Sequence, residues 1–292
     1  MKKEMPDHVQ EILSKYSGRE IRIARCTSLG GGSINAAYRL HTGDRDFFIK
    51  YNDAKKFPGM FDREARGLRL LASTRTLRVP EFIAAGTWDT QDFLILEFLD
   101  RGKMGAKFWE DFGMQLAAMH AHTQAAFGLD HDNYIGSLPQ VNTMKSDFIS
   151  FFIEKRLQPQ FEMAVQDQPS MRELVPYFER LFKRLPEIIP EEKSALLHGD
   201  LWSGNFLVGP EGKACIIDPA VYYGHRESDL AMSRLFGGFD EEFYSAYNTA
   251  FPLAPGWEER TDVFNLYPLL VHVNLFGGGY IQQVATVIRR FS

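Results

Sequence analysis

The sequence contains no run of 18 apolar residues, so it predicts no helix that crosses a membrane. Its first residues, MKKEMPDHVQEIL, carry lysine but no long apolar core, so we do not expect a secretory signal. It contains only two cysteines, Cys26 and Cys215, and their spacing is not that of metal ligands. Two separate thiols in strand-like segments favour a reducing compartment, and a cytoplasmic location is therefore expected.

The chain also lacks an excess of basic residues. Its 33 Lys and Arg stand against 38 Asp and Glu, for a formal net charge of -5. Nucleic acids and anionic membranes are bound through clustered Lys and Arg, so neither is an expected partner. The 45% apolar and 24% charged residues are ordinary for a globular protein with a sizeable core.

The first hundred residues are predicted to form a small antiparallel sheet with one crossing helix. A further helix is expected before the sheet, over residues 5–17, and the crossing helix over 60–72. Alternating or continuous apolar runs predict strands over residues 20–26, 34–40, 46–51, 82–87 and 93–98.

The rest of the chain is predicted to be mainly helical. The irregular segment 127–137 is long and glycine-marked, which is typical of a site loop. Apolar residues at helical spacing predict helices near residues 108–122, 146–166, 170–186, 228–236, 240–250, 259–275 and 280–290.

The most specific pattern lies in residues 198–218. An apolar strand leads into H-G-D, Asn205 follows Asp200 by five residues, and a later apolar run ends at Asp218. The catalytic loop of kinases, H-R-D-L-x-x-x-N followed by a strand-borne acid, has this spacing, with Gly199 here in place of arginine. Each polar residue taken singly also fits an ordinary turn. Their joint spacing favours a phosphotransferase.

A glycine-rich hairpin precedes a lysine in the N-terminal half. Gly30, Gly31, Gly32 and Ser33 separate two strands, and glycines let backbone N–H groups approach phosphates without obstruction by a Cβ atom. An ordinary flexible turn is the alternative. Lys50 ends an apolar strand soon afterwards, where a kinase places the lysine that contacts the α and β phosphates of ATP. Its alternative is a solvated lysine.

Two carboxylates on the helix predicted over residues 60–72 compete as the partner of Lys50. Glu64 fits the lysine–glutamate ion pair of kinases, and Asp62 lies half a turn away on a different face. Either carboxylate also stabilises the helix N-terminus without any further role.

A hinge between two lobes is expected where the last strand of the sheet ends. Glu97, Phe98 and Leu99 close an apolar run that leads into a linker-like Asp100-Arg101-Gly102. The backbone of this segment reads the adenine edge in kinases, so these three residues are candidates for nucleotide binding. Because a buried, unpaired acid is costly, we expect Glu97 at the strand exit.

The chemistry of γ-phosphoryl transfer gives each polar residue a role. Lys50, held by Glu64, would position the phosphates. Asn205 and Asp218 offer hard oxygen ligands that suit Mg²⁺, and the absence of a His or Cys ligand set argues against zinc. Asp200 would orient the acceptor hydroxyl and take its proton.

The segment after Asp218 predicts a small acceptor. Ten residues without an A-P-E motif separate it from Asp229, whereas protein kinases place an activation loop here. Asp229 is expected near a helix start, either as an N-cap or bound to the catalytic-loop backbone. His198 is expected to pack beneath that loop.

Three strings together resemble the fructosamine kinase (ketosamine 3-kinase) family, a relative of the aminoglycoside phosphotransferases and choline kinases. They are G-G-G-S-I-N at 30–35, H-G-D-L-W-S-G-N at 198–205 and D-P-A-V-Y-Y-G-H-R-E at 218–227. The resemblance covers essentially the whole chain and implies an α+β, two-lobed, protein-kinase-like fold. Residues 1–98 would form the ATP-binding lobe, and residues 99–292 a larger, mainly α-helical lobe for catalysis and acceptor binding.

The activity that the resemblance implies is phosphorylation of the 3-hydroxyl of a ketosamine, with ATP and Mg²⁺, by a monomer or weak dimer. The ketosamine would be a fructosamine, ribulosamine or erythrulosamine on an amine or lysine, so the reaction would serve deglycation. Candidates for the acceptor pocket are Trp202, Tyr223, His225 and Glu227. Core packing is the alternative for Trp202, and an ion pair with Arg226 or another helix is the alternative for His225 and Glu227.

Two rival functions follow from the same residues. One is another small-molecule kinase of this fold, acting on an aminoglycoside, choline or a sugar. The other is a nucleotide-binding pseudokinase that serves as a scaffold. The presence of Lys50, Asp200, Asn205 and Asp218 together disfavours the scaffold, which has no chemical need for all four.

Overall fold

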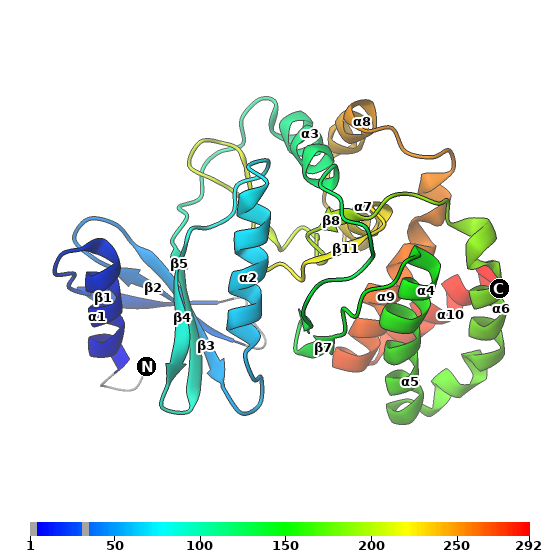
Figure 1. The fold of residues 1–292 in the computed structure, drawn as a ribbon, viewed down its shortest axis with the longest axis horizontal. Helices are drawn as coiled ribbons and strands as arrows, with labels where there is room; N and C mark the ends of the chain where they lie inside the picture. The colour runs from blue at the N-terminus through cyan, green and yellow to red at the C-terminus, as the bar shows by residue number, and fades with distance from the viewer. Residues whose placement is uncertain (1–4, 31–34) are drawn as a thin grey trace. The chain divides into compact units, whose positions relative to one another are not determined.

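The computed structural model describes residues 5–30 and 35–292 (Figure 1). Gly31, Gly32 and Ser33 of the predicted phosphate loop lie outside the described residues. The chain forms two compact units, which we call the first and the second unit. The first comprises Met1–Met104 with Leu207–Ile217, and the second Gly105–Phe206 with Asp218–Ser292. The assignment of residues 1–98 to ATP binding and 99–292 to catalysis stays a prediction.

The first unit is built on a five-stranded antiparallel sheet in the order β1-β2-β3-β5-β4. Its strands are β1 (Arg25–Leu29), β2 (Ala36–His41), β3 (Phe47–Asp53), β4 (Phe82–Trp88) and β5 (Gln91–Glu97). Helix α1 (Met5–Ser17) precedes the sheet, and α2 (Met60–Ser73) crosses it between β3 and β4. The paired strands β9 (Phe206–Val208) and β10 (Ala214–Ile216) return later in the chain. The predicted small sheet lobe is therefore confirmed.

Strand β3 places its side chains alternately on the two faces of the sheet. Phe47, Ile49 and Tyr51 are buried in a core that the sheet shares with α1. Lys50 lies between Ile49 and Tyr51 in the strand, so it points to the opposite face, which α2 covers (Figure 1). The alternation of this strand therefore decides which helix Lys50 meets.

The strand predicted over residues 20–26 is wrong for most of its length, because β1 begins only at Arg25. The cause is a contact with α1. Ser14 Oγ accepts a hydrogen bond from the backbone N–H of Ile21 at 2.9 Å, and a second α1 side chain binds the backbone two residues later. Helix side chains thus take the donors that a neighbouring strand would otherwise have bound.

The second unit is mainly helical, as predicted. Its helices are α3 (Phe108–His120), α4 (Phe148–Phe152), α5 (Gln158–Asp167), α6 (Val175–Ile188), α7 (Glu227–Leu235), α8 (Glu241–Ala250), α9 (Trp257–Phe276) and α10 (Gly279–Phe291). Two short antiparallel pairs join β6 (Asn133–Ile135) to β7 (Leu138–Gln140), and β8 (Ala195–Leu197) to β11 (Tyr222–Gly224). The segment 127–137, expected to be irregular, therefore contains a strand.

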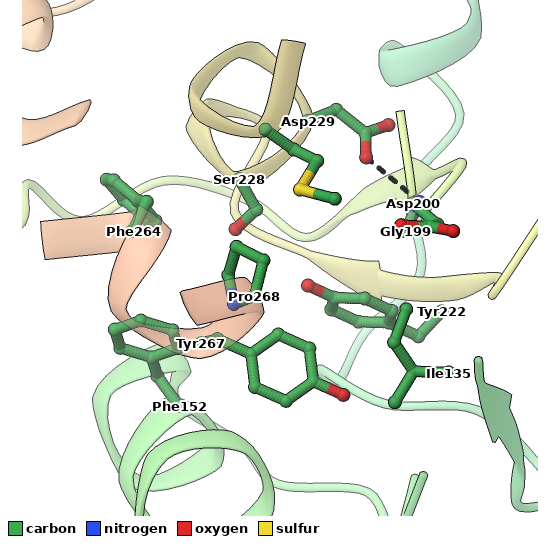
Figure 2. Close-up of a pocket in the computed structure, with 11 residues that line it drawn as sticks. Ile135, Phe152, Gly199, Asp200, Tyr222, Ser228, Asp229, Phe264, Tyr267 and Pro268 are labelled. Carbon is green, nitrogen blue, oxygen red and sulfur yellow. Dashed lines mark hydrogen bonds between the residues drawn. The ribbon is translucent and has the colours of Figure 1, made fainter. Parts of the chain in front are cut away.

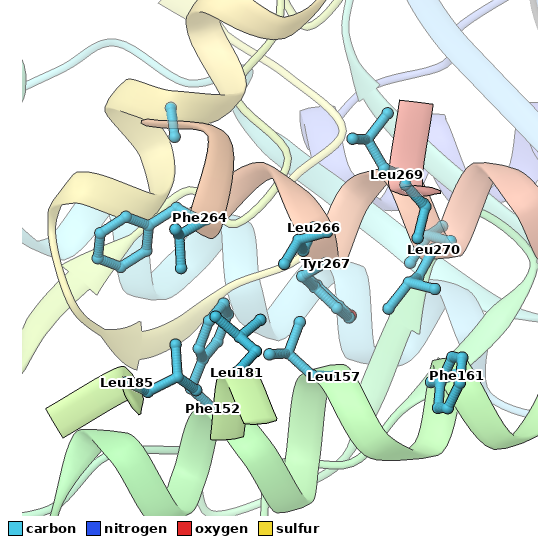
Figure 3. Packing of buried hydrophobic residues seen from close by; sticks show 14 of the residues in the cluster. Phe152, Leu157, Phe161, Leu181, Leu185, Phe264, Leu266, Tyr267, Leu269 and Leu270 are labelled. Carbon is cyan, nitrogen blue, oxygen red and sulfur yellow. The ribbon is translucent and has the colours of Figure 1, made fainter. Parts of the chain in front are cut away.

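The core of the second unit forms around α9. Residues 263–271 of this helix are all buried, which is typical of a helix surrounded by other elements on every side. Figure 3 shows its Leu266, Tyr267, Leu269 and Leu270 packed with apolar side chains of α5, α6 and their neighbours. This central helix gives the loops around it a rigid support.

The single helices predicted over residues 146–166 and 170–186 are each divided. A π-helical turn, η1 (Ile153–Leu157), separates α4 from α5, and a 3₁₀ segment, η2 (Pro169–Leu174), precedes α6. Such π turns within α-helices are frequent at functional sites. Among the residues that the structure describes, no helix is long and apolar enough to span a membrane.

Candidate active site

In the first unit, a buried ion pair joins strand β3 to helix α2. Lys50 Nζ lies 2.8 Å from Glu64 Oε2, and the two side chains are only 7% and 11% exposed. The predicted choice of Glu64 over Asp62 is thus confirmed as a contact. A buried pair of this kind holds the ammonium group in one place because neither charge can return to water.

A second polar contact ties the end of the glycine-rich segment to the same strand. Asn52 of β3 donates a hydrogen bond from Nδ2 to Asn35 Oδ1 at 3.1 Å. Asn52 follows Lys50 by two residues and therefore lies on the same face of the sheet. Gly30, at the start of the segment, is exposed, and a Cβ atom added to it would meet none of the described residues within 4 Å.

The predicted hinge residues lie at the end of β5 and directly after it. Glu97 is the last residue of that strand, as expected, and its carboxylate accepts hydrogen bonds from Arg78 Nη2 at 2.7 Å and from the backbone N–H of Glu81 at 3.2 Å. The guanidinium of Arg39 lies 4.0 Å above the ring of Phe98, and Leu99 is buried. The side chains of this segment are therefore anchored, whereas its role in adenine binding stays a prediction.

In the second unit, the catalytic-loop candidate is closed by one amide side chain. Asn205 Nδ2 donates to Asp200 Oδ2 at 2.7 Å and to the Asp200 carbonyl oxygen at 2.9 Å. The backbone N–H of Asn205 also bonds to the carbonyl of Trp202 at 2.9 Å. The five-residue spacing of Asp200 and Asn205 thus forms a tight loop that fixes the orientation of the Asp200 carboxylate.

The glycine that replaces the kinase arginine is required by its surroundings. Gly199 has φ +82°, and a Cβ atom on it would lie 2.1 Å from the carbonyl oxygen of Ala220. Only glycine tolerates both conditions. Asp218, two residues before Ala220, has φ +51°, which is rare for a residue other than glycine. The two segments that carry Asp200 and Asp218 therefore pass each other at close range.

Asp229 anchors the backbone of the same loop. Its carboxylate accepts hydrogen bonds from the N–H groups of His198 at 2.7 Å and Gly199 at 2.9 Å, and His120 Nε2 lies 3.2 Å away. The expected contact of Asp229 with the loop backbone is therefore confirmed. Its alternative role as an N-cap is wrong, because the N-cap of α7 is Arg226. Burial by itself raises the pKa of Asp229, but these hydrogen bonds and the nearby histidines hold it below its usual value.

Burial raises the pKa of Asp200 to about 7, and the carboxylates of Asp218 and Asp229 add to the rise, while the hydrogen bond from Asn205 opposes it. Asp200 nevertheless retains some exposed surface. A carboxylate with a raised pKa is a better proton acceptor, which suits the role of a general base. His198 is fully buried beneath the loop, as predicted.

The donor set fits a hard divalent cation. Because Asn205 uses Nδ2 to bind Asp200, its amide oxygen remains as the atom that can face a cation. The Asp218 carboxylate is close enough to Asp200 to raise its pKa, so negative charge is concentrated here. Mg²⁺ is bound through one or two such oxygens and retains waters for the rest of its shell.

A pocket lies beneath the catalytic-loop candidate (Figure 2). Gly199 and Asp200 form one edge of it, and Ser228 and Asp229 of α7 form another. Its walls are mainly aromatic and apolar: Ile135, Phe152, Tyr222, Met232, Phe264, Tyr267 and Pro268. The loop therefore rests on a floor built from α4, β6, β11, α7 and α9.

The family model for fructosamine kinases matches residues 5–292. The chain belongs to the fructosamine kinase family. Its fold is protein-kinase-like, as the sequence predicts, and its relatives are ATP-dependent phosphotransferases. The loop of Asp200 and Asn205 therefore lies in a kinase rather than in an unrelated polar turn.

Curated and solved relatives in this family are similar over nearly their whole length. A probable ketoamine kinase of Synechocystis sp. is 40% identical, over 97% of this chain and 95% of its own. The chloroplastic protein-ribulosamine 3-kinase of Arabidopsis thaliana is 40% identical, over 93% and 83%. The crystal structure of a putative fructosamine-3-kinase from Haemophilus somnus is 27% identical and covers 97% of this chain and 96% of its own, with a TM-score of 0.87. A spectinomycin phosphotransferase in complex with ADP and spectinomycin is 15% identical, with a TM-score of 0.57 over 98% of this chain and 93% of its own, and shares the fold alone.

Two of the acceptor candidates, Trp202 and Tyr223, are only partly buried. The Trp202 ring packs over Gly204 so closely that a Cβ atom there would lie 2.3 Å from it. Tyr223 lies in β11 opposite Leu196. Both side chains keep some surface that a ligand can reach.

The other two acceptor candidates, His225 and Glu227, are engaged inside the second unit. Glu227 forms a bidentate ion pair with Arg260, at 2.6 and 2.9 Å, and is only 1% exposed. His225 is fully buried, with Nε2 3.2 Å from the carbonyl oxygen of Pro190. For Glu227 the structure therefore shows the alternative given above, an ion pair with another helix. Neither side chain has a surface for an acceptor.

The loop of Asp200 and Asn205 also depends on residues that the sequence did not single out. Gln140 donates from Nε2 to the Ala220 carbonyl at 3.1 Å and to Asn133 Oδ1 at 2.7 Å. Asn142 donates to the same Asn133 oxygen at 2.9 Å, and the fully buried Arg156 of η1 donates to Asn142 Oδ1 at 2.7 Å. This buried amide network supports the segment after Asp218. Only the polar character of residues 127–142 hinted at it.

Proposed function

We propose that this chain transfers the γ-phosphoryl group of ATP to the 3-hydroxyl of a ketosamine, with Mg²⁺. The observation that carries the proposal is the Asn205–Asp200 hydrogen bond inside a loop whose backbone Asp229 anchors, in a chain matched by the fructosamine kinase model over residues 5–292. The names of the relatives support a ketosamine as the acceptor.

On the nucleotide side, Lys50 binds the α and β phosphates while Glu64 keeps its ammonium group in position. The glycine-rich segment from Gly30 to Ser33 covers the phosphates with backbone N–H groups. The backbone of Glu97, Phe98 and Leu99 reads the adenine edge. These three contacts are part of the proposal, and all of them are made with ATP, the anionic substrate.

On the acceptor side, Asp200 orients the 3-hydroxyl and takes its proton. Asn205 holds Asp200 in the required orientation and, together with Asp218, supplies oxygen ligands to Mg²⁺. When bound, this ion neutralises charge that develops on the transferred phosphoryl group. Trp202 and Tyr223 are the acceptor contacts that we retain from the sequence, because both keep accessible surface.

The test is a coupled assay of ADP formation with ribulose-, erythrulose- and fructose-amines as acceptors, and Asp200→Ala as the inactive control. At least one ketosamine should be turned over by the wild type, with a phosphate on its 3-hydroxyl by NMR and an absolute need for Mg²⁺. Turnover of an aminoglycoside, choline or a free sugar instead of every ketosamine would contradict the proposal.

A further inference from the structure

A row of aromatic rings leads away from the catalytic-loop candidate across the surface of the second unit. Trp202 meets Phe236 at 5.9 Å between ring centroids, and Phe236 meets His272 at 4.7 Å. His272 meets Phe276 at 5.5 Å and Tyr280 at 4.9 Å. We call these five residues the aromatic strip. It begins two residues after Asp200 and ends where α9 gives way to α10.

The strip reaches solvent instead of closing into the core. Phe276 is 58% exposed, more than any other large apolar side chain among the described residues, and the other four members are partly exposed. A single exposed apolar side chain is ordinary, but a continuous row that starts on the loop carrying Asp200 is typical of a binding surface.

The strip itself carries no side chain that would repel a cation. Residues 263–288, which supply three of its five rings, contain no Lys, Arg, Asp or Glu. Helix α9 ends at Phe276 with no basic residue in its last turn, and α10 begins at Gly279 with no acidic residue in its first, so the opposite partial charges of the two neighbouring helix ends offset each other. Burial lowers the pKa of His272, and the hydrogen bond from its Nδ1 to the Pro268 carbonyl at 2.8 Å opposes that shift, so the balance favours the uncharged ring.

Resting on the proposed function, we propose that the aromatic strip is the subsite for the amine-bearing chain of the ketosamine. The nitrogen of a ketosamine is a secondary amine that is protonated at neutral pH, and a protonated amine is attracted to the faces of aromatic rings. Three carbons, C1 to C3 of the sugar, separate this nitrogen from the oxygen of the 3-hydroxyl. With the 3-hydroxyl at Asp200, the amine therefore lies at Trp202. The group that bears this amine, which we call the carrier, continues along the strip toward Phe276.

This assignment predicts a preference that depends on the carrier. A ketosamine on methylamine is too short to reach the far rings, whereas one on the side chain of a lysine continues along them. The matched acceptors are therefore the same ketosugar on methylamine and on Nα-acetyl-lysine amide. Phe276→Ala is the test variant, because its exposed side chain can be removed without opening the core. Met144→Ala, at a side chain of the same unit that is 46% exposed, is the control.

Phe276→Ala should raise the KM of the lysine-borne ketosamine about tenfold, the loss expected when the apolar stem of the uncharged carrier loses its contact with one aromatic ring. Its kcat, its KM for ATP and its KM for the methylamine-borne ketosamine should stay within about twofold of wild type. Phe276→Tyr should restore the lysine-borne KM, and Met144→Ala should not change it. Equal changes for both acceptors, or no change for either, would overturn the proposal.

Calorimetric binding of the lysine-borne ketosamine, without ATP, separates this proposal from the proposed function. If the wild type turns over no ketosamine but binds this ligand about tenfold more tightly than Phe276→Ala does, the proposed function fails and the subsite stands. If turnover occurs and the two proteins bind the ligand equally, the subsite fails and the function stands. If the wild type does not bind the ligand, the subsite fails as well.

Discussion

The two units of the chain carry opposite net charge. Residues of the first unit include 19 Lys and Arg against 15 Asp and Glu, a net charge of +4, whereas those of the second include 14 against 23, a net charge of -9. ATP is an anion and a protonated ketosamine is a cation. The net charge of each unit thus has the sign that attracts the substrate we assign to it. The electrostatic field of such a charge raises the association rate, and salt screens this effect. The overall value of -5 conceals this division.

The units also hold their functional side chains by different means. In the first, Lys50 is held by the opposite charge of Glu64. In the second, Asp200 is held by the neutral amide of Asn205 on a loop whose backbone N–H groups bind Asp229. Removing one partner of a charge pair leaves a buried charge, whereas changing a carboxylate to an amide keeps most hydrogen bonds. We therefore expect mutations to damage folding in the first unit and chemistry in the second.

The largest expected effect is on catalysis in the second unit. Asp200→Asn should lower kcat by about 10²- to 10⁴-fold, because an amide cannot take the proton of the acceptor hydroxyl. The amide has nearly the same shape and can still accept the hydrogen bond from Asn205. The melting temperature should therefore stay within about 3 °C of wild type. Steady-state kinetics and thermal unfolding measure the two effects.

Asp167→Asn, at an exposed aspartate of the same unit, is the matched control and should change neither quantity. A kcat for Asp200→Asn within tenfold of wild type would remove Asp200 from the chemistry. A large drop in its melting temperature would instead remove the contrast between the units.

A smaller effect, this time on folding, is expected in the first unit. Lys50→Met leaves the Glu64 carboxylate in a buried position without its cation, which should lower the free energy of unfolding by about 3–5 kcal/mol. Replacing both residues, as Lys50→Met with Glu64→Leu, should recover most of that loss but none of the activity. Urea unfolding of the two single variants and the double variant provides the cycle.

The control for this cycle is another ion pair of the first unit. Arg78 and Glu97 lie 2.7 Å apart, but their side chains are 43% and 25% exposed. Arg78→Met should therefore cost at most about 1 kcal/mol. If Lys50→Met proves as mild as Arg78→Met, then burial does not distinguish the two pairs and the contrast with the second unit is lost.

The parts of the site that the sequence predicts are those encoded locally. The loop from Asp200 to Asn205 follows from spacing within one segment, and the pairing of Lys50 with Glu64 follows from the strand-then-helix order of kinases. Apolar periodicity likewise predicts α2 and α3 within a few residues. In each case the information lies in neighbouring residues or in a short, repeated arrangement.

The parts that the sequence does not predict depend on partners far apart in the chain. From the sequence, Glu227 is a candidate for contact with the acceptor, but in the structure its carboxylate is bound by Arg260, 33 residues later. Gln140 is an unremarkable polar residue until its amide is found on the carbonyl of Ala220, 80 residues away. Charged and amide side chains have many possible partners, and only the packed fold selects one. The strand expected from Glu20 fails for the same reason, because α1 takes its backbone donors.

The smallest expected effect is a sensitivity to acid that belongs to the second unit. Burial lowers the pKa of His225 from 6.5 to about 4; Glu192 opposes the shift, while Arg226 and Arg260 add to it. As pH falls below 6.5, the unfolded chain gains a proton at this residue and the folded chain does not. The neutral histidine therefore contributes its full stability above pH 6.5 and loses it progressively toward pH 4.

His225→Gln removes this titration while its amide can still donate to the Pro190 carbonyl. Between pH 7.5 and pH 5, the free energy of unfolding of the wild type should fall by about 2 kcal/mol more than that of the variant. Urea unfolding at three pH values measures the difference, and His122→Gln, at an exposed histidine of the same unit, should follow the wild type. Parallel curves for wild type and His225→Gln would mean that the buried ring is not what makes the acidic unit sensitive to acid. The sensitivity would then have to come from the other buried groups of the second unit.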